Sequence, residues 1–311
     1  MLSIITPSYN NGNLLKRLYK SIKNQSYKEI HWIIVDDGST DSTQKIIKEF
    51  RKIKITYINQ DNRGTNCARN RGEKEILDDC KYVIYMDSDD TFFDKDSINM
   101  MVEDIEKTSK NIGAVGYTSI DSFTRKNFTF LRTSPLKVSY LDSIKGTSFN
   151  GEFISIQKVE ILKYSQWPEG ISGYEAIRHW KINKHCDYLL YSKPARVYHR
   201  DRKNNLTSPE TTVKRSLNMA KSIEMLLNHY GKDLITHAKN KYYYYLLTQS
   251  LYYSLSGKNK KSVNSLLRSF SFNISIKNNI ITILIIILLL LPTNIRCKLY
   301  IFIKNLNYNY S

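Results

Sequence analysis

Cysteine is scarce in this chain of 311 residues, and the few cysteines form no pattern. They lie far apart, at Cys67, Cys80, Cys186 and Cys297. There is no CxxC pair, and neither the cysteines nor the histidines have the spacing of metal ligands. A disulfide-stapled scaffold and a zinc finger are therefore excluded, and we expect reduced thiols that are mostly buried.

A secretory signal is also missing from the sequence. The apolar start, residues 2–5, is too short for a signal peptide and turns polar at Ser8. We therefore expect the chain to stay on the cytoplasmic side of the membrane.

Acidic residues become scarce in the second half of the chain. Residues 1–110 hold 18 basic and 18 acidic side chains, whereas residues 111–311 hold 29 basic and 11 acidic ones. No zinc-finger spacing or RNA-recognition string accompanies this charge, so we expect no nucleic-acid partner. The basic residues lie beside an apolar run at 280–291, which points instead to an anionic membrane surface.

The first 120 residues alternate short β-branched runs with amphipathic stretches, which is typical of parallel strands joined by crossover helices. Helices are expected over 14–22, 46–50 and 160–164. Strands are expected over 2–6, 31–35, 53–58, 82–86, 114–118, 153–156, 188–191 and 195–198. The pattern predicts an open, mostly parallel α/β sheet, in which ligands bind outside the carboxyl ends of the strands.

Carboxylates follow two of these strands. Asp36 and Asp37 come after the second strand, and Asp87, Asp89 and Asp90 come after the fourth. Three carboxylates within four residues repel one another unless a counter-charge is present. Mn²⁺ or Mg²⁺ would supply that charge, because both prefer oxygen ligands. The alternative is a group of loop or helix-capping aspartates on a solvated surface.

Four motifs follow one another in an order that resembles the family 2 nucleotide-sugar glycosyltransferases with the GT-A fold. They are SIITPSYN at 3–10, VDDGSTD at 35–41, NRG leading to ARN at 62–70, and DSDD at 87–90. The resemblance implies a nucleotide-sugar-binding half at 1–110 and an acceptor and catalytic half at 111–207. We expect a basic helical region at 208–311, with a membrane-associating segment at 274–306.

The resemblance assigns the nucleotide site residue by residue. Tyr9 would stack on uracil, Asp37 would accept the imide N–H, and Arg69 would line the base pocket. Asp87 would meet the ribose hydroxyls, and Asp89 would ligate the metal that bridges the diphosphate. The motif neighbours Pro7 and Ser88 complete the expected nucleotide-binding set.

The resemblance also implies a catalytic base and a group that binds the diphosphate. In the family the base is a carboxylate of a Gly-Glu-Asp string, and Glu175 in Gly173-Tyr174-Glu175 takes that place. Tyrosine replaces the first acid and glutamate the aspartate, so Glu169 stays an alternative base. His199 and Arg202, in a basic stretch after the last strand, would stabilise the departing diphosphate.

The apolar run at 280–291 is twelve residues, which as a helix spans about 18 Å and cannot cross a core of about 30 Å. Pro292 interrupts the run, and Arg296 and Lys298 follow among apolar residues. An in-plane or re-entrant helix pair therefore fits better than a span. A buried core helix is the alternative.

Three further points lie beyond residue 150: Gly151-Glu152-Phe153, Gly173 with Glu175-Ala176, and the end of the apolar run, Leu291-Pro292-Thr293-Asn294. In these, the second half of the chain is similar to bacterial enzymes that extend undecaprenyl-diphosphate-linked oligosaccharides. The resemblance implies an inverting transfer of a hexose, glucose or galactose, from a UDP-sugar to a lipid-linked oligosaccharide. The pathway would be that of O-antigen, capsule or glycan assembly at the cytoplasmic face of the membrane. The altered Gly173-Tyr174-Glu175 string leaves one alternative, a catalytically impaired membrane-bound protein that binds sugar nucleotides or acts as a scaffold.

Overall fold

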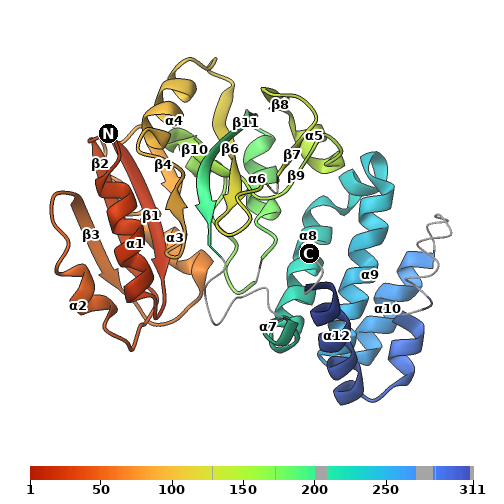
Figure 1. Cartoon of the computed structure of the whole chain (residues 1–311). Helices are drawn as coiled ribbons and strands as arrows, with labels where there is room; N and C mark the ends of the chain where they lie inside the picture. Colours follow the sequence, from red (N-terminus) through yellow and green to blue (C-terminus); the bar gives the residue numbers. More distant parts are fainter. Residues whose placement is uncertain (128, 172, 200–208, 271–282, 284, 309–311) are drawn as a thin grey trace. The chain divides into compact units, whose positions relative to one another are not determined.

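The computed structural model describes residues 1–127, 129–171, 173–199, 209–270, 283 and 285–308, and the chain divides into two compact units (Figure 1). Unit 1 comprises Met1–Glu169 and Arg178–Arg202. Unit 2 comprises Gly170–Ile177 and Lys203–Ser311.

A nine-stranded sheet, counted over the described residues, forms the centre of unit 1. Its strand order is β3-β2-β1-β4-β10-β6-β11-β5, and β8 also pairs with β11. The first four strands in this order run parallel, whereas β10 is antiparallel to both of its neighbours. The strands are β1 (Leu2–Ser8), β2 (Ile30–Asp36), β3 (Lys54–Asn59), β4 (Tyr82–Tyr85), β5 (Thr91–Phe92), β6 (Ile112–Asp121), β8 (Leu136–Val138), β10 (Ile154–Lys158) and β11 (Asp187–Tyr198). A small second sheet pairs β7 (Phe130–Leu131) with β9 (Phe149–Asn150).

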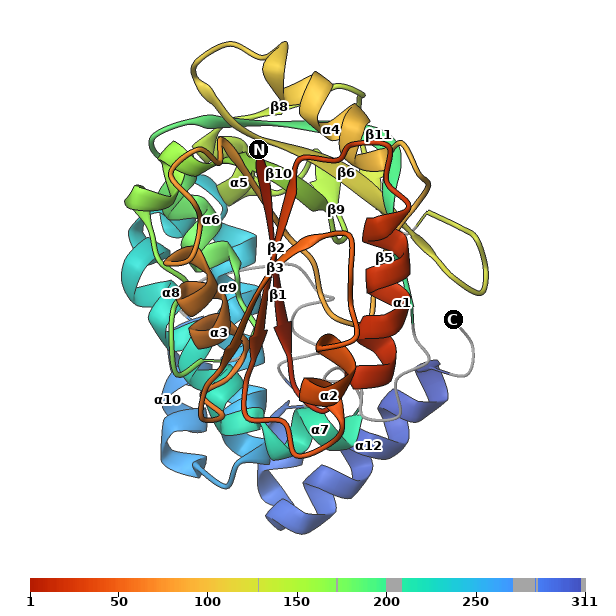
Figure 2. The same ribbon diagram turned by 90° about the vertical axis from the view of Figure 1, so that its left-hand side faces the viewer.

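Helices cover both faces of the sheet. Figure 2 shows α1 (Gly12–Lys23) and α2 (Thr43–Ile47) on one side of β1 to β3, and α3 (Thr65–Glu73) on the other. Alternate residues of β1 serve the two faces, because Ile4 packs with the α1 side chains and Ile5 packs with Ala68 of α3. A Cβ on Gly72 would lie 2.7 Å from Ile5 Cγ2, so glycine allows α3 to approach β1 closely.

The remaining elements of unit 1 follow the same layering. They are α4 (Ser97–Glu106), α5 (Tyr140–Lys145), the 3₁₀ helix η1 (Val159–Tyr164) and most of α6 (Ala176–Asn183).

The predicted strands are confirmed, with one difference. The segments 188–191 and 195–198 form one strand, β11, whose register shifts on either side of Pro194. The helix predicted at 160–164 is confirmed as the 3₁₀ helix η1. Cys67 and Cys80 are buried, while Cys186 and Cys297 are half-buried, and all four are free thiols.

Unit 2 is helical. It contains α7 (Pro209–Lys214), α8 (Ser216–His237), α9 (Lys239–Leu255), α10 (Asn259–Phe270) and α12 (Thr293–Tyr308), and residues 285–290 are also helical. Tyr243 and Leu247 of α9 pack with Leu266 and Ile285 in its core. Within the described part of the chain, every helix is too short or too polar to cross a bilayer.

Arg296 holds together the turn between residues 285–290 and α12. The side chain is 3% exposed and donates to the backbone carbonyls of Leu289, Leu291 and Ser254 and to Asn259 Oδ1. The guanidinium therefore satisfies carbonyl groups at two helix ends, which carry no intrahelical partner. Arg296 is accordingly not one of the exposed basic residues of this segment.

Candidate functional site

The loops after β1 and β2 are tied together by Asn10. Its backbone lies in the left-handed region, with φ of 51°. Its Oδ1 accepts from the backbone N–H of Thr40 at 2.8 Å, and its own N–H donates to Ser39 Oγ at 2.8 Å. This arrangement fixes the neighbouring Tyr9, whose side chain stays 42% exposed. An aromatic face is thus available at the carboxyl edge of the sheet.

Asp37 organises the loop that leads into α3. Its Oδ1 accepts from Gln60 Nε2 at 2.7 Å and from the backbone N–H of Arg63 at 2.9 Å, and its Oδ2 accepts from the N–H of Gly64 at 2.8 Å. Gly64 has φ of 90°, which a side chain would make costly. A carboxylate offers about four acceptor positions, and these contacts use three of them. Asp37 therefore shapes the loop and can still accept one more N–H.

The loop at 87–90 carries two of its three carboxylates in ion pairs. Asp87 Oδ1 lies 3.2 Å from Arg69 Nη2 of α3. The buried Asp90 lies 3.3 Å from Arg196 Nη1 of β11 and also accepts from the backbone N–H of His199 at 3.1 Å. Burial acts to raise the pKa of Asp90, and the adjacent Arg196 acts to lower it. Much of the repulsion expected within this loop is therefore relieved by two arginines.

The donor set at this loop fits a divalent cation that a substrate helps to hold. Over the described residues there is no group of three or more His, Cys, Asp or Glu side chains that could hold a metal ion alone. Asp87 and Asp90 are paired with arginines, and Asp89 is the third carboxylate of the loop. Mg²⁺ in particular is commonly bound through one or two carboxylates plus substrate phosphates, so one aspartate beside a diphosphate is a sufficient protein contribution.

Other predicted residues lie at the same edge. Ser88 Oγ accepts from Asn11 Nδ2 at 2.7 Å, and Pro7 is buried near the end of β1. His199 Nε2 lies 3.1 Å from Thr91 Oγ1. Unit 1 thus contains all the predicted nucleotide and metal residues and His199. Arg202 lies outside the described residues.

The two candidate bases differ in their surroundings. Glu169 is bonded to Asn70 Nδ2 at 3.1 Å and to Arg63 Nη2 at 3.3 Å, and the Asn70 hydrogen bond is the largest cause that lowers the pKa of Glu169. Glu175 belongs to unit 2 and is exposed. It follows Gly173 and Tyr174, which both have left-handed backbones, with φ of 68° and 60°. A tyrosine is rare in this region, so the direction of Glu175 is set by an unusual turn.

Four arginines stand out in the structure, and only Arg69 was predicted from sequence. Arg178 is fully buried and pairs with Glu73 at 3.3 Å. Arg196 binds Asp90, and Arg17 Nη2 donates to the backbone carbonyl of Asp89 at 2.5 Å. Arginine is usually exposed, so a single sequence carries no signal that marks these positions.

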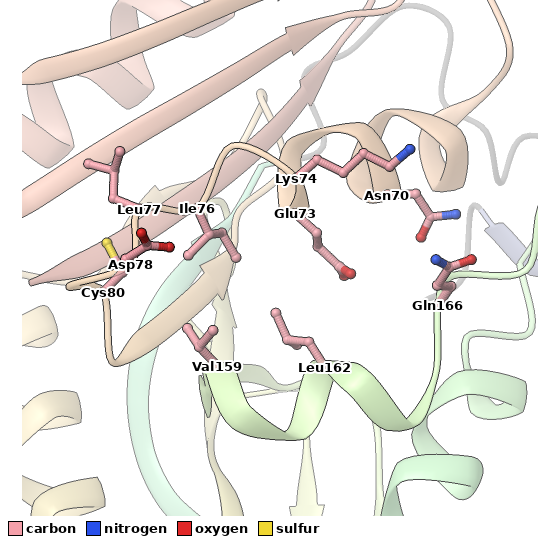
Figure 3. A pocket seen from close by; sticks show the side chains of 10 residues that line it. All are labelled: Asn70, Glu73, Lys74, Ile76, Leu77, Asp78, Cys80, Val159, Leu162 and Gln166. Carbon is pink, nitrogen blue, oxygen red and sulfur yellow. The ribbon is translucent and has the colours of Figure 1, made fainter.

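A hollow of about 380 Å³ lies elsewhere in unit 1 (Figure 3). It is lined by the end of α3, the segment 76–80 and η1, and Figure 3 shows the Glu73 carboxylate pointing into it. Tyr9, Asp37 and Asp87 are not among its lining residues. Asn70, the last residue of the third motif, does line it, so the hollow adjoins that motif but is distinct from the site formed by Tyr9, Asp37 and Asp87.

The sequence matches the family described as Glycosyl transferase family 2 over residues 3–162, slightly more than half of the chain. The chain belongs to glycosyl transferase family 2. The family predicted from the four motifs is confirmed, and the protein is a transferase.

Curated relatives differ in how much of their length this chain covers. The GalNAc(5)-diNAcBac-PP-undecaprenol beta-1,3-glucosyltransferase of Campylobacter jejuni is 25% identical over 322 residues, with 96% of each chain covered. Glycosyltransferase GlyA of Streptococcus pneumoniae is 35% identical over 122 residues, which are 39% of this chain and 17% of that protein. The chain thus spans only about a fifth of the length of several curated glycosyltransferases that it matches.

Solved structures confirm the GT-A fold. S. aureus TarS 1–349 in complex with UDP-GlcNAc has a TM-score of 0.57 at 17% identity, with 85% of this chain and 88% of that chain covered. The mannosyltransferase PcManGT from Pyrobaculum calidifontis, in complex with GDP-Man and Mn²⁺, has a TM-score of 0.57 at 16% identity. That comparison covers 98% of this chain and 86% of the other.

Removing one partner of the ion pair between Asp90 and Arg196 is expected to destabilise unit 1 strongly. Replacing Arg196 by Met leaves the buried Asp90 carboxylate without its cation, which typically costs about 3–5 kcal/mol, and also removes the contacts of Arg196 with Glu152 and Ser119. Adding Asp90→Asn should recover part of this loss. Urea unfolding measures both effects.

The control is Lys107→Met, which breaks the exposed pair with Glu103 and should cost less than about 1 kcal/mol. Equal losses for Arg196→Met and Lys107→Met would contradict the assignment.

Proposed function

We propose that this family 2 enzyme transfers a hexose, glucose or galactose, with inversion from a UDP-sugar to a polyprenyl-diphosphate-linked oligosaccharide. The product would serve O-antigen, capsule or glycan assembly. The observation that carries the proposal is the gathering of Tyr9, Asp37, Arg69 and Asp87 at one carboxyl edge of the sheet. The UDP-GlcNAc complex of TarS supports a UDP-sugar donor, and the Campylobacter relative supports a lipid-linked acceptor.

The nucleotide would be bound by groups that differ in chemistry. Tyr9 would stack on uracil with its exposed ring, and Asp37 would accept the imide N–H with its remaining acceptor position. Arg69 would line the base pocket beside Asp87, whose half-exposed carboxylate would bind the ribose hydroxyls. Pro7 and Ser88 would border the same site.

Asp89 would hold Mn²⁺ or Mg²⁺ together with the diphosphate. A cation there supplies charge neutralisation of the phosphate oxygens. The Mn²⁺ complex of PcManGT supports this choice.

Asp89→Ala should weaken UDP binding at least about tenfold when Mn²⁺ is present, because the carboxylate no longer holds the cation against the diphosphate. Isothermal titration calorimetry with UDP and Mn²⁺ measures the change. Asp78→Ala removes an exposed carboxylate elsewhere in unit 1 and is the matched control. If Asp89→Ala bound UDP as tightly as the wild type in the presence of Mn²⁺, the assignment of Asp89 as the metal ligand would be wrong.

Glu175 would act as the general base that takes the acceptor hydroxyl proton as the anomeric carbon becomes electron-poor. Its exposure suits a group that must reach an acceptor. Glu169, whose carboxylate is bonded to Asn70 and Arg63, stays the alternative base. His199 and Arg202 would stabilise the leaving diphosphate.

Glu175→Gln should retain UDP binding and lose at least about 10²-fold in turnover, because the amide cannot accept the proton. Turnover is measured with a panel of UDP-sugars and synthetic lipid-diphosphate acceptors by mass spectrometry. Glu169→Gln is the matched control. Full activity of Glu175→Gln would remove this residue from the mechanism, and a wild-type chain that binds UDP but transfers no sugar would favour a binding or scaffold role.

We further infer that unit 2 docks on an anionic membrane surface at its cytoplasmic face. Most of the exposed large apolar side chains of the described residues fall within 263–303, and Leu290 is 80% exposed. They are Val263, Leu267, Phe270, Ile283, Ile286, Ile287, Leu290, Ile295, Leu299, Phe302 and Ile303. Exposed basic residues occur just before this segment, at Lys258 and Lys261, and within it, at Arg268 and Lys298. Apolar and basic groups together favour in-plane binding to anionic lipid.

Replacing Ile287, Leu290 and Phe302 by Ser should reduce binding to phosphatidylglycerol vesicles at least about tenfold, since each loses exposed apolar area that lipid would cover. Vesicle co-sedimentation measures the change. The control is Phe123→Ser in unit 1, where the side chain is 73% exposed. Binding that is equally strong in the triple variant would refute membrane docking through this segment.

A further inference from the structure

The loop before Glu169 is held to α3 by Asn70. The Asn70 side-chain amide donates to the Trp167 carbonyl at 2.9 Å and accepts from the Trp167 N–H at 2.8 Å. Asn66, one turn earlier on α3, donates to the Pro168 carbonyl at 2.8 Å. These bonds satisfy the backbone of a loop that has no strand partner, and they fix where the Trp167 side chain enters the core.

The Trp167 ring lies against two arginines. It is 4.4 Å from the Arg69 guanidinium and 4.5 Å from that of Arg178, measured to the ring centroid. Its Nε1 donates to Glu73 Oε1 at 2.8 Å. Arg69 and Glu73 are four residues apart on α3 and therefore share a face of the helix. One side chain, 4% exposed, thus contacts both ends of that face.

Charges around the ring are balanced separately. Arg178 pairs with Glu73, which also accepts from Tyr85 Oη, so this pair is complete within the core. Arg69 pairs with Asp87, whose carboxylate is still 45% exposed. Burial, with the two arginines adding to it, lowers the pKa of His179 to about 3, so its neutral imidazole adds no third positive charge. The ring therefore supports both arginines from within the core, and Arg69 is the one of these two that faces the candidate nucleotide site.

We propose that Trp167 is a positioning residue for nucleotide binding, which holds the Arg69 guanidinium through a cation–π contact in the orientation that reaches Asp87. The proposal rests on the proposed function, because Arg69 and Asp87 are assigned there to the base and ribose. A desolvated cation–π contact is strong enough to matter for the direction of a side chain with four rotatable bonds. It also gives Asn70 of the ARN motif a physical role, since this residue holds Trp167.

The test is a double-mutant cycle on UDP binding, measured by calorimetry with Mn²⁺. Trp167→Leu, which lacks a π face, should weaken UDP binding about 5- to 30-fold, and Trp167→Phe, which keeps one, should stay within about threefold of wild type. Arg69→Ala should also weaken binding. In the Arg69→Ala background, Trp167→Leu should add less than about twofold, because its effect passes through Arg69.

The control for lost packing is Trp32→Leu, another buried tryptophan, which stacks on Phe50 and should leave the Kd for UDP unchanged. If Trp167→Leu does not fold, as judged by thermal unfolding, Trp167→Met takes its place in the cycle. Independent, multiplying effects of Arg69 and Trp167 would overturn the proposal.

The outcomes separate this proposal from the proposed function. Wild-type protein that binds no UDP contradicts the UDP-sugar assignment alone, and the cycle is then run with GDP as the probe. Normal nucleotide binding by Arg69→Ala contradicts both the assignment of Arg69 and the role of Trp167.

Discussion

The crowding of negative charge in residues 87–90 is the constraint that shapes this site. Three carboxylates after one buried strand would resist folding if each had to be desolvated without a partner. Two arginines from distant parts of the sequence neutralise two of these carboxylates. They are Arg69 of α3 and Arg196 of β11. Each arginine also fixes the element that bears it against the loop. The charge pairs therefore assemble the carboxyl edge of the sheet as well as neutralise it.

This pairing divides the aspartates by task. Asp90 is buried and holds β11 through both Arg196 and the His199 backbone, so it belongs to the framework of the loop. Asp87 stays half-exposed beside Arg69 and keeps acceptor capacity for a ligand. Burying an ion pair between aspartate and arginine costs desolvation energy. Apolar residues of similar volume would fill the same space without this cost. Retaining charge at this edge is consistent with a site that must bind a polar substrate.

How far the sequence predicts the structure depends on the signal that each element carries. The β-branched runs predicted the strands, and the aspartate motifs predicted the carboxyl edge of the sheet. Both predictions succeed because they depend only on residues that are close together in the sequence. Helix α3 was not predicted, since its buried face includes Arg69 and Asn70 and shows no apolar stripe. Arg178 and Arg196 find their partners only after the sheet assembles. The sequence predicted two strands, 188–191 and 195–198, where the structure has one. Pro194 lies between them at a shift in strand register, which the pattern of apolar residues does not indicate.

Unit 2 presents a different balance of charge and apolar surface. Isoleucine, leucine and phenylalanine side chains of the segment 263–303 are exposed to water. Transfer of these side chains from water to an apolar surface would lower their free energy. A buried charge in the same segment would normally oppose contact with lipid, but Arg296 already donates to carbonyls of its own unit. Contact of this surface with a bilayer would therefore not leave Arg296 unpaired.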